Sequence, residues 1–271
     1  MPPHVRMAAA QMILVRSIVT ALAEEPYDHP LSRHGQSLHD RYLLPFWMWR
    51  DFEDVLAFLA GRGQALPVDG YRPFLEMRCP LVGHLFAGDV RLEVRNALEP
   101  WHVLGEETTT TGTSRYVDSS VERIEVLADG VDPARHRVLV NGQSLPMVPT
   151  GKAGQYVGGV RFRAWAPPHS LHPHLGIHHP IQLDILDTWG KRSLGACAYH
   201  VWHPEGRAFD APPLTRFEAS ARRAQRFTVE PPKPWPVEPI AGNVHPDAPY
   251  SLDLRRHPVD RPMPKPKKEN A

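Results

Sequence analysis

The chain of 271 residues is long enough for one large domain or two small ones, and its 42% apolar and 23% charged residues are ordinary globular usage. Its 31 basic and 30 acidic residues exclude a strongly basic nucleic-acid binder and an acidic tail protein. Two cysteines exclude a disulfide-dense secreted scaffold and a cysteine-rich zinc module. No run of about 18 uninterrupted apolar residues occurs, so we expect no membrane span. The 30 prolines and 16 histidines are unusually many.

The N-terminal segment predicts an amphipathic helix. Pro2 and Pro3 suit a helix start, and apolar residues then recur at spacings of three and four. A signal peptide is the alternative, because the sequence 21–23 (ALA) resembles a cleavage site. Gln11 and Arg16 interrupt the apolar run, so we favour the helix. The predicted apolar stripe consists of Val5, Ala8, Met12, Val15, Val19 and Leu22.

Two more helices are expected before residue 70. Residues 32–44 mix polar and apolar character, and residues 46–60 have an apolar stripe of helical spacing that ends at Gly61. Trp47 and Trp49 lie two positions apart, which favours a helix packed on two sides. An aromatic platform for a sugar or a cofactor is the alternative.

From about residue 74 the apolar period changes from 3.6 to 2, which is typical of half-buried strands. Asn141-Gly142 lies between two apolar runs and predicts a two-residue hairpin. A last short helix is expected at 215–227. Helices followed by many strands predict an α+β fold with an antiparallel sheet or sandwich, rather than alternating β-α units. The strand candidates are 74–79, 90–95, 116–126, 138–140, 145–148, 156–165, 181–186 and 193–202.

The predicted organisation has three parts. Residues 1–70 are helical, and residues 71–230 are mainly β, in the same domain or packed tightly against it. Residues 231–271 hold 11 of the 30 prolines, and each proline removes a backbone donor and fixes φ. We expect this Pro-rich segment to be an extended or disordered tail. A ligand for an aromatic groove is the alternative.

A histidine-rich stretch is the first candidate site. Three histidines and a water form a catalytic zinc pattern, because neutral imidazole is a common metal ligand. The spacing matches no standard helix motif, and neighbouring prolines place the stretch in a loop, so we favour surface histidines. The residues are His169, His172, His174, His178 and His179, followed by His200 and His203.

The segment 115–123 concentrates two arginines, two carboxylates and two hydroxyls. A polar strand face of this kind could hold a metal-bound phosphate or pair a guanidinium with a carboxylate substrate. A solvated face with cross-strand ion pairs is the alternative. As one strand, the segment would put Arg115, Ser119 and Arg123 on one face and Asp118, Ser120 and Glu122 on the other.

Two further candidates are weaker. Residues 99–107 read as an active-site loop that carries His102 and Glu106, with a Thr/Gly lid at 108–113; a simple connection is the alternative. Cys197 lies near His200 in sequence, and a nucleophile needs a base within reach. Because Cys197 lies in an apolar strand, we favour a buried, inert thiol.

Five strings of the sequence carry a family resemblance: 1–7 (MPPHVRM), 39–42 (HDRY), 97–107 (ALEPWHVLGEE), 114–125 and 199–207 (YHVWHPEGR). Together they resemble the amidoligase domain of unknown function that lies C-terminal to transglutaminase-like domains in large bacterial proteins. The resemblance covers residues 1–228, which is everything except the tail.

The resemblance implies a relation to glutamine synthetase-like carboxylate–amine ligases. Those enzymes activate a carboxylate as an acyl phosphate with ATP and a metal, and an amine then attacks. In the family, the Met-Pro-Pro motif lies inside the domain, after a longer ligase-like half, and the transglutaminase-like site lies upstream. We therefore expect a C-terminal part of a larger protein that is not active alone. Its partners would be upstream domains of the same protein or a separate chain that supplies them.

The first hypothesis is thus that the chain is part of an ATP-dependent amidoligase. The enzyme would act on carboxylate and amine groups of a peptide or similar substrate. ATP and Mg²⁺ would be its cofactors if the upstream half is present. The residues expected to carry the chemistry are Arg115 and Arg123 for phosphate or carboxylate, Asp118 and Glu122 for Mg²⁺, Ser120 and Glu106 for the cofactor, and His102 on the loop.

The second hypothesis is a β-sandwich module that binds without catalysis, positioning substrate or docking an adjacent catalytic domain. Four tryptophans expected at the surface motivate it: Trp101, Trp165, Trp189 and Trp202. We expect a cytoplasmic protein without nucleic-acid or membrane partners, because no targeting signal is evident and the two cysteines look unpaired.

Overall fold

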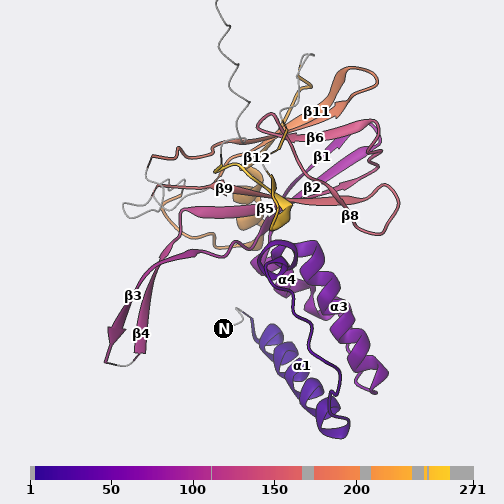
Figure 1. The fold of residues 1–271 in the computed structure, drawn as a ribbon, viewed down its shortest axis with the longest axis vertical. Coiled ribbons are helices and arrows are strands. Elements are labelled where there is room, and N and C mark those ends of the chain that lie inside the picture. The colour runs from indigo at the N-terminus through magenta and orange to yellow at the C-terminus, as the bar shows by residue number, and fades with distance from the viewer. Residues whose placement is uncertain are drawn as a thin grey trace, which may run out of the picture.

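The computed structural model describes residues 4–110, 112–166, 174–201, 209–233, 241–242 and 244–256. The helices before residue 80 form a lobe beside a body of two β-sheets, and a two-stranded arm projects from the body (Figure 1). The α+β class with helices first, strands next and one late helix is therefore confirmed.

The first helix of the lobe is unusually exposed. α1 (Val5–Glu24) begins where the His4 imidazole accepts a hydrogen bond from the Arg6 amide at 3.1 Å. Only Ser17 and Ala21 of α1 are buried. By length and composition α1 could cross a membrane, but a signal sequence or a core helix meets the same test. The predicted helix is confirmed, whereas its apolar stripe does not face a core.

The lobe continues with α2 (Ser37–Asp40), the 3-10 turn η1 (Arg41–Leu43) and α3 (Pro45–Gly61). The expected helix at 32–44 is thus reduced to two short turns. α3 confirms the prediction for 46–60, and it starts with a proline in its first turn, where no backbone donor is needed.

The segment predicted as a strand at 74–79 is instead a helix. After η2 (Val68–Tyr71), α4 (Arg72–Arg78) begins with Pro73 in its first turn. Tyr71, Leu75 and Cys79 are spaced by four residues and are all buried in the core of the lobe. Six residues are too few to separate a period of 2 from a period of 3.6, so the prediction was wrong here.

The larger sheet has the strand order β1-β2-β5-β9-β14-β13, with β8 also paired to β9. All its pairings are antiparallel except that of β14 with β9, which is parallel. The strands are β1 (Leu81–Ala87), β2 (Val90–Ala97), β5 (Val121–Asp129), β8 (Val148–Pro149), β9 (Tyr156–Arg163), β13 (Val244–His245) and β14 (Ala248–Asp253).

The smaller sheet is antiparallel with the order β12-β11-β10-β6-β7. Its β6-β7 connection is the predicted hairpin: Asn141 and Gly142 have φ of 48° and 81°, as a type I′ turn requires. The strands are β6 (His136–Val140), β7 (Gln143–Ser144), β10 (Ile181–Asp187), β11 (Arg192–Tyr199) and β12 (Phe227–Glu230).

The two sheets enclose one apolar core, so the body is a sandwich. Leu92, Ile124 and Val160 of the larger sheet pack in the same cluster as Leu183 and Ile185 of the smaller sheet. The larger sheet therefore has an inner face toward this core and an outer face toward the helices (Figure 1). The outer face becomes important below, because its side chains are charged.

Part of the segment expected to be a tail lies in the larger sheet. β14 pairs with β9 and buries Ser251, Leu252 and Asp253. Proline density hid this strand, because only Ala248–Asp253 have the required pattern inside a Pro-rich context. Residues 257–271 lie outside the described residues. The late helix is confirmed as α5 (Arg216–Ala224), which Thr215 caps through a hydrogen bond from the Glu218 amide.

The arm consists of β3 (His102–Thr109) and β4 (Gly112–Asp118), which pair only with each other. The expected loop at 99–107 is therefore largely a strand. The segment 115–123 is not one strand either, because a turn at Ser119-Ser120 separates β4 from β5. The predicted sharing of a face by Arg115 and Arg123 is wrong for this reason.

Candidate functional site

A row of charged side chains crosses the outer face of the larger sheet. Arg123 of β5 is the register partner of Arg161 of β9, which is the partner of Asp253 of β14. Register partners project from the same face of a sheet. Their neighbours Val160 and Leu252 are in the sandwich core, so the charged row points the other way. The structure thus gathers charge from three strands at the junction of body, lobe and arm.

Glu99 joins this row from the segment between β2 and β3. Its carboxylate accepts a hydrogen bond from Arg123 Nε at 2.8 Å. Arg161 Nε lies 3.2 Å and Arg255 Nη1 lies 3.6 Å from the same carboxylate. The Arg123 and Glu99 side chains are almost completely buried. Burial lowers the pKa of Arg123, and the adjacent Glu99 charge opposes that shift.

Asp40 extends the charged row toward the lobe. Its carboxylate accepts hydrogen bonds from the Tyr250 amide at 2.8 Å and from Ser251 Oγ at 2.7 Å. Arg123 donates to the backbone carbonyls of His39 and Asp40 at 2.7 and 2.8 Å. A single buried guanidinium therefore connects the lobe to the sheet.

Asp253 and Arg255 close the group on its far side, with Arg255 Nε 2.7 Å from Asp253 Oδ1. Burial alone would raise the pKa of Asp253, but the hydrogen bond and charge of Arg255 outweigh burial and lower it. We call these six residues the arginine–carboxylate cluster. They are Arg123, Arg161, Arg255, Asp40, Glu99 and Asp253.

The base of the arm lies beside the cluster. Buried Asp118 accepts a hydrogen bond from the Ser120 amide at 3.0 Å. Burial alone would lower the pKa of Arg255, but Asp253, with smaller contributions from the charges of Glu99 and Asp118, raises it. Two indoles brace the turn: Trp101 Nε1 donates to the Val121 carbonyl at 3.1 Å, and Trp165 Nε1 donates to the Ser119 carbonyl at 2.8 Å. The arm is thus held at its base, and among the described residues its two strands pair only with each other.

Six of the seven predicted site residues lie in three places. Arg123 is inside the cluster, while Asp118 and Ser120 lie at the arm base. Arg115 and Glu106 form an exposed cross-strand ion pair on the arm, with Nε and Oε1 2.6 Å apart. His102 is also exposed on the arm. The structure therefore connects most of these residues along one path from arm to cluster.

Glu122 departs from that path. It is the register partner of Phe162, which lies in the sandwich core, so Glu122 lies on the inner side of the sheet. Burial raises its pKa, partly offset by the charge of Arg226. Asp118 and Glu122 thus have different neighbours, and the described residues contain no group of three His, Cys, Asp or Glu side chains that could hold a metal. The magnesium site expected at Asp118 and Glu122 therefore stays a prediction, with no third protein ligand beside them among the described residues.

Sequence reasoning missed most of the cluster. Asp40, Arg161 and Arg255 are far apart in the chain; Arg161 and Arg255 stand in no recognisable motif, and Asp40 lies in the string 39–42, which carried the family resemblance but no prediction of a site residue. The one available signal was Arg161-Phe162-Arg163, which places two arginines on one strand face.

A sequence profile of a family described as "putative amidoligase enzyme" matches residues 1–255. The chain belongs to this amidoligase family. No curated protein and no solved structure matches it significantly. The match includes the lobe, the arm, both sheets and β14, and therefore every residue of the arginine–carboxylate cluster.

The two cysteines of this amidoligase-family chain are not suited to nucleophilic chemistry. Cys79 and Cys197 are free and buried. Burial raises the pKa of each thiol to about 12, so neither is a thiolate at neutral pH. The inert thiol predicted at Cys197 is confirmed.

The histidine-rich stretch falls partly outside the described residues, which include neither His169 and His172 nor His203. His178 Nδ1 accepts a hydrogen bond from the Arg163 amide at 3.0 Å, and burial lowers the pKa of this imidazole. His200 Nε2 lies 3.1 Å from the Thr228 hydroxyl. These two rings therefore already have partners in the body of the protein.

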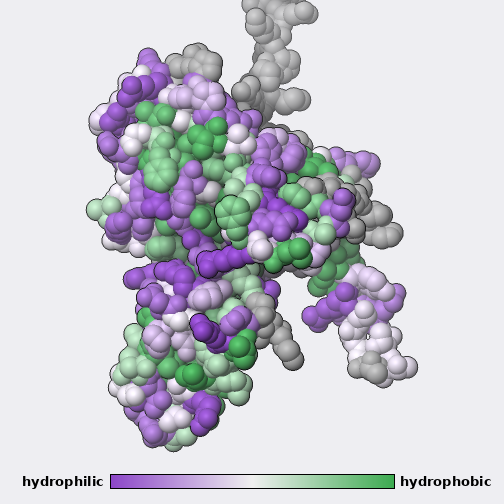
Figure 2. Space-filling model, turned by 180° about the vertical axis from the view of Figure 1, so that it is seen from behind, coloured by the Kyte–Doolittle hydropathy of each residue, from purple (hydrophilic) through white to green (hydrophobic). Residues whose placement is uncertain are grey.

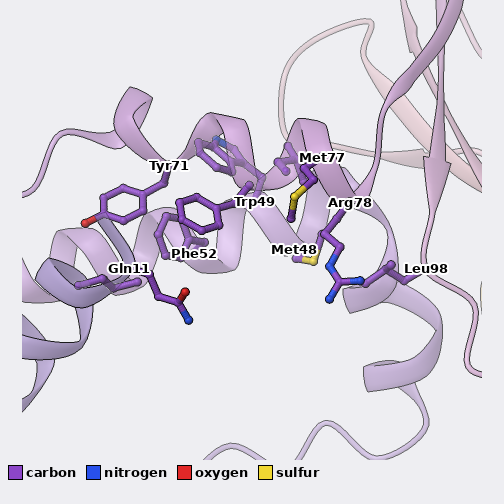
Figure 3. A pocket seen from close by; sticks show the side chains of 11 residues that line it. Gln11, Met48, Trp49, Phe52, Tyr71, Met77, Arg78 and Leu98 are labelled. Carbon is purple, nitrogen blue, oxygen red and sulfur yellow. The ribbon is translucent and has the colours of Figure 1, made fainter. Parts of the chain in front are cut away.

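The amidoligase-family chain also has a cavity of about 630 Å³ in the lobe, between α1, α3 and α4. Figure 3 shows aromatic and methionine side chains lining it, together with the polar side chains of Gln11 and Arg78. It contains no carboxylate and none of the predicted site residues. The cavity and the cluster are therefore separate features. The lining residues are Gln11, Leu14, Met48, Trp49, Phe52, Tyr71, Phe74, Leu75, Met77, Arg78 and Leu98.

Proposed function

We propose that this chain is part of an ATP-dependent carboxylate–amine ligase whose substrate passes between the arm and the arginine–carboxylate cluster. Family membership supports ligase chemistry. The single observation that supports this location is the concentration of three guanidinium groups at the base of an exposed arm. Arginine is well suited to bind carboxylates and phosphates because its planar fork donates two parallel hydrogen bonds.

The proposed reaction has two steps. A substrate carboxylate oxygen attacks the γ-phosphorus of ATP, the bond to the bridging oxygen breaks, and ADP leaves with an acyl phosphate formed. An amine nitrogen then attacks the acyl carbon, the carbon–oxygen bond to phosphate breaks, and the nitrogen loses a proton. Negative charge accumulates on phosphate oxygens in both steps, where fixed cations act most strongly.

We assign two kinds of role. Arg115 and His102 on the arm are the groups that can reach a substrate, because both are exposed. Arg123 and Glu99 are positioning residues, because they are buried and hold the segments around them. No step is assigned to magnesium, because among the described residues no group of three His, Cys, Asp or Glu side chains could hold it; magnesium bound to ATP would take most of its ligands from phosphates and water. The remaining groups would come from upstream domains, in the transglutaminase-like context that the resemblance implies, or from a separate chain.

The test is ATP turnover in the longest native polypeptide that contains this chain. Hydroxylamine should trap an acyl phosphate as a hydroxamate, and ADP release should require a carboxylate donor. Arg115→Ala should reduce turnover at least about tenfold, which corresponds to one lost charge-assisted contact. The matched control is Arg50→Ala, which removes an equally exposed arginine from the Arg50–Glu53 ion pair of α3. Absence of carboxylate-dependent ATP turnover would contradict the proposal.

A second candidate function is binding without catalysis. It is favoured by the exposed apolar side chains Trp101, Val103 and Tyr116 along the arm, whereas Trp165 is half-buried and Trp202 lies outside the described residues. A peptide array without ATP distinguishes the two functions. Saturable binding that Tyr116→Ser abolishes, together with no ATP turnover, would favour the binding module.

A further inference from the structure

α1 presents a continuous apolar seam to solvent. The side chains of Met12, Val15 and Val19 are 61%, 48% and 62% exposed, while Ser17 and Ala21 on the other side of the helix are buried. Apolar residues gather on the surface of the helical lobe (Figure 2). We call this surface the outer seam. It consists of Val5, Ala8, Met12, Val15, Val19 and Leu22.

The spacing of the outer seam identifies the kind of partner. The steps between its residues are 3, 4, 3, 4 and 3, which is a heptad repeat through nearly three heptads. Two apolar positions in every seven form the narrow seam of a helix pair, whereas a helix on a bilayer or against a globular core has a broader apolar face. The partner that fits this surface is therefore another helix with the same repeat.

We propose that α1 pairs in antiparallel orientation with α1 of a second copy of this chain. The seam contains no charged residue, so it is complementary to itself. The helix has no acidic residue in its first turn and no basic residue in its last turn, and its ends carry Arg6 and Glu24. Antiparallel pairing brings these opposite charges, and the opposite ends of the two helix dipoles, to the same place. Parallel pairing would bring like charges together.

The antiparallel arrangement has a definite register. Val15 of one copy lies opposite Met12 of the second copy, and Val19 lies opposite Ala8 of the second copy. Val5 then meets Leu22 of the second copy at each end. Larger residues face smaller ones along the seam, as close helix packing requires. This inference is independent of the proposed ligase function, because no residue of the cluster or arm takes part in it.

The first test is the mass of the purified chain by light scattering across a concentration series. Association should give twice 30.6 kDa at the upper end of the series. Val15→Asp should weaken the dimer at least about tenfold, because it places two charges in the apolar seam. The matched control is Ile13→Asp: Ile13 is 52% exposed on the same helix but lies outside the seam, and its replacement should leave the dimer unchanged.

The second test is disulfide cross-linking, which shows whether the two copies of α1 pair in antiparallel or parallel orientation. Ala8→Cys and Val19→Cys variants, mixed in equal amounts and mildly oxidised, should form a disulfide-linked heterodimer. Each variant alone should form much less, because neither residue meets its own copy in an antiparallel pair. The native Cys79 and Cys197 are buried and do not interfere.

Four outcomes would overturn the proposal. The chain could remain monomeric throughout the concentration series, or Ile13→Asp could dissociate the dimer as strongly as Val15→Asp. Binding of the monomer to phosphatidylcholine vesicles, lost in Val15→Asp, would identify the outer seam as a lipid-binding face instead. Cross-linking of each single variant with itself would reject the antiparallel orientation.

Discussion

The sandwich and the helical lobe differ in how tightly their side chains pack. The sandwich encloses large side chains from both sheets in one core, and many of them are completely buried. The lobe has a smaller core, a cavity of about 630 Å³ and a first helix with two buried residues. Because stability increases with buried apolar surface, we expect the sandwich to contribute most of the free energy of unfolding. The lobe then depends on the interactions that attach it to the sheet.

Several of those attachments are polar. Arg123 binds the carbonyls of His39 and Asp40, and Glu125 of β5 accepts a hydrogen bond from the Phe46 amide at 2.8 Å, in the first turn of α3. Buried polar contacts contribute little net energy when complete but are costly when one partner is removed. We call these contacts between the lobe and the larger sheet the joint. We therefore expect single substitutions at the joint to lower stability more than substitutions within the lobe or within the sandwich.

The largest effect is expected for Arg123→Met. This change leaves the buried Glu99 carboxylate without its closest cation and breaks two hydrogen bonds to the lobe. The free energy of unfolding should fall by about 3–5 kcal/mol, as for other broken buried ion pairs. Urea denaturation measures it. The double variant Arg123→Met/Glu99→Leu should recover part of the loss; a double variant as unstable as the single one would show that ion pairing is not the cause.

The next largest effect separates the two cores. Ile185→Ala removes a completely buried side chain from the sandwich and should cost about 2–5 kcal/mol. Leu14→Ala removes a half-buried side chain that already borders the lobe cavity, and should cost about 1 kcal/mol or less. Both values come from urea denaturation. Equal costs would mean that the lobe is as tightly packed as the sandwich.

A third prediction concerns the pH dependence of the joint. Burial raises the pKa of Glu125 to about 8, although the hydrogen bond from the Phe46 amide favours the charged form. Between about pH 5 and pH 8 the unfolded chain loses this proton while the folded chain keeps it, so stability should decrease as the pH rises. The decrease should be on the order of a few kcal/mol at most.

Glu125→Gln keeps an acceptor for the Phe46 amide but cannot ionise. Its melting temperature should therefore fall less than that of the wild type between pH 5.5 and 8.5, and it should be the more stable protein at pH 8. The matched control is Asp129→Asn. Asp129 lies on the same strand as Glu125, but it forms an ion pair with Lys152 at the protein surface. An unchanged pH profile in Glu125→Gln would show that Glu125 ionises normally.

The sequence predicted the helical spacing of apolar residues correctly but not which face of the helix is buried. The stripe of α1 has the expected helical spacing, yet it faces solvent, and the packed side consists of Ala10, Leu14, Ser17, Ile18 and Ala21 instead. Periodicity shows that a helix has two faces, but only the partner decides which is buried. Leu14 and Ile18 also recur at helical spacing, so α1 has two apolar faces and spacing alone does not choose between them. Spacing was also insufficient at α4, where the six residues 74–79 fit the strand period of 2 as well as the helix period of 3.6.

The candidate site was partly predictable for a different reason. Residues 115–123 were singled out for their charge density, and Arg123 is indeed in the cluster. The carboxylates that complete it, Asp40 and Asp253, lie about 80 and 130 residues away along the chain. The strand order of the larger sheet brings Asp253 beside Arg123, the contact of α2 with β14 brings Asp40 there, and no spacing rule contains that information.

The smallest predicted effect tests backbone freedom in the two regions. Gly61 is the last residue of α3, and a Cβ there would meet nothing within 4 Å, so Gly61→Ala should stabilise the protein by about 0.5 kcal/mol. Gly130 follows β5 with φ of 77°, and a Cβ there would lie 2.0 Å from the Asp89 carbonyl oxygen, so Gly130→Ala should destabilise. Thermal unfolding of both variants measures the difference. If Gly61→Ala were destabilising as well, the end of α3 would be constrained by contacts like those of the sandwich, and the comparison between a tight body and a loose lobe would fail at that point.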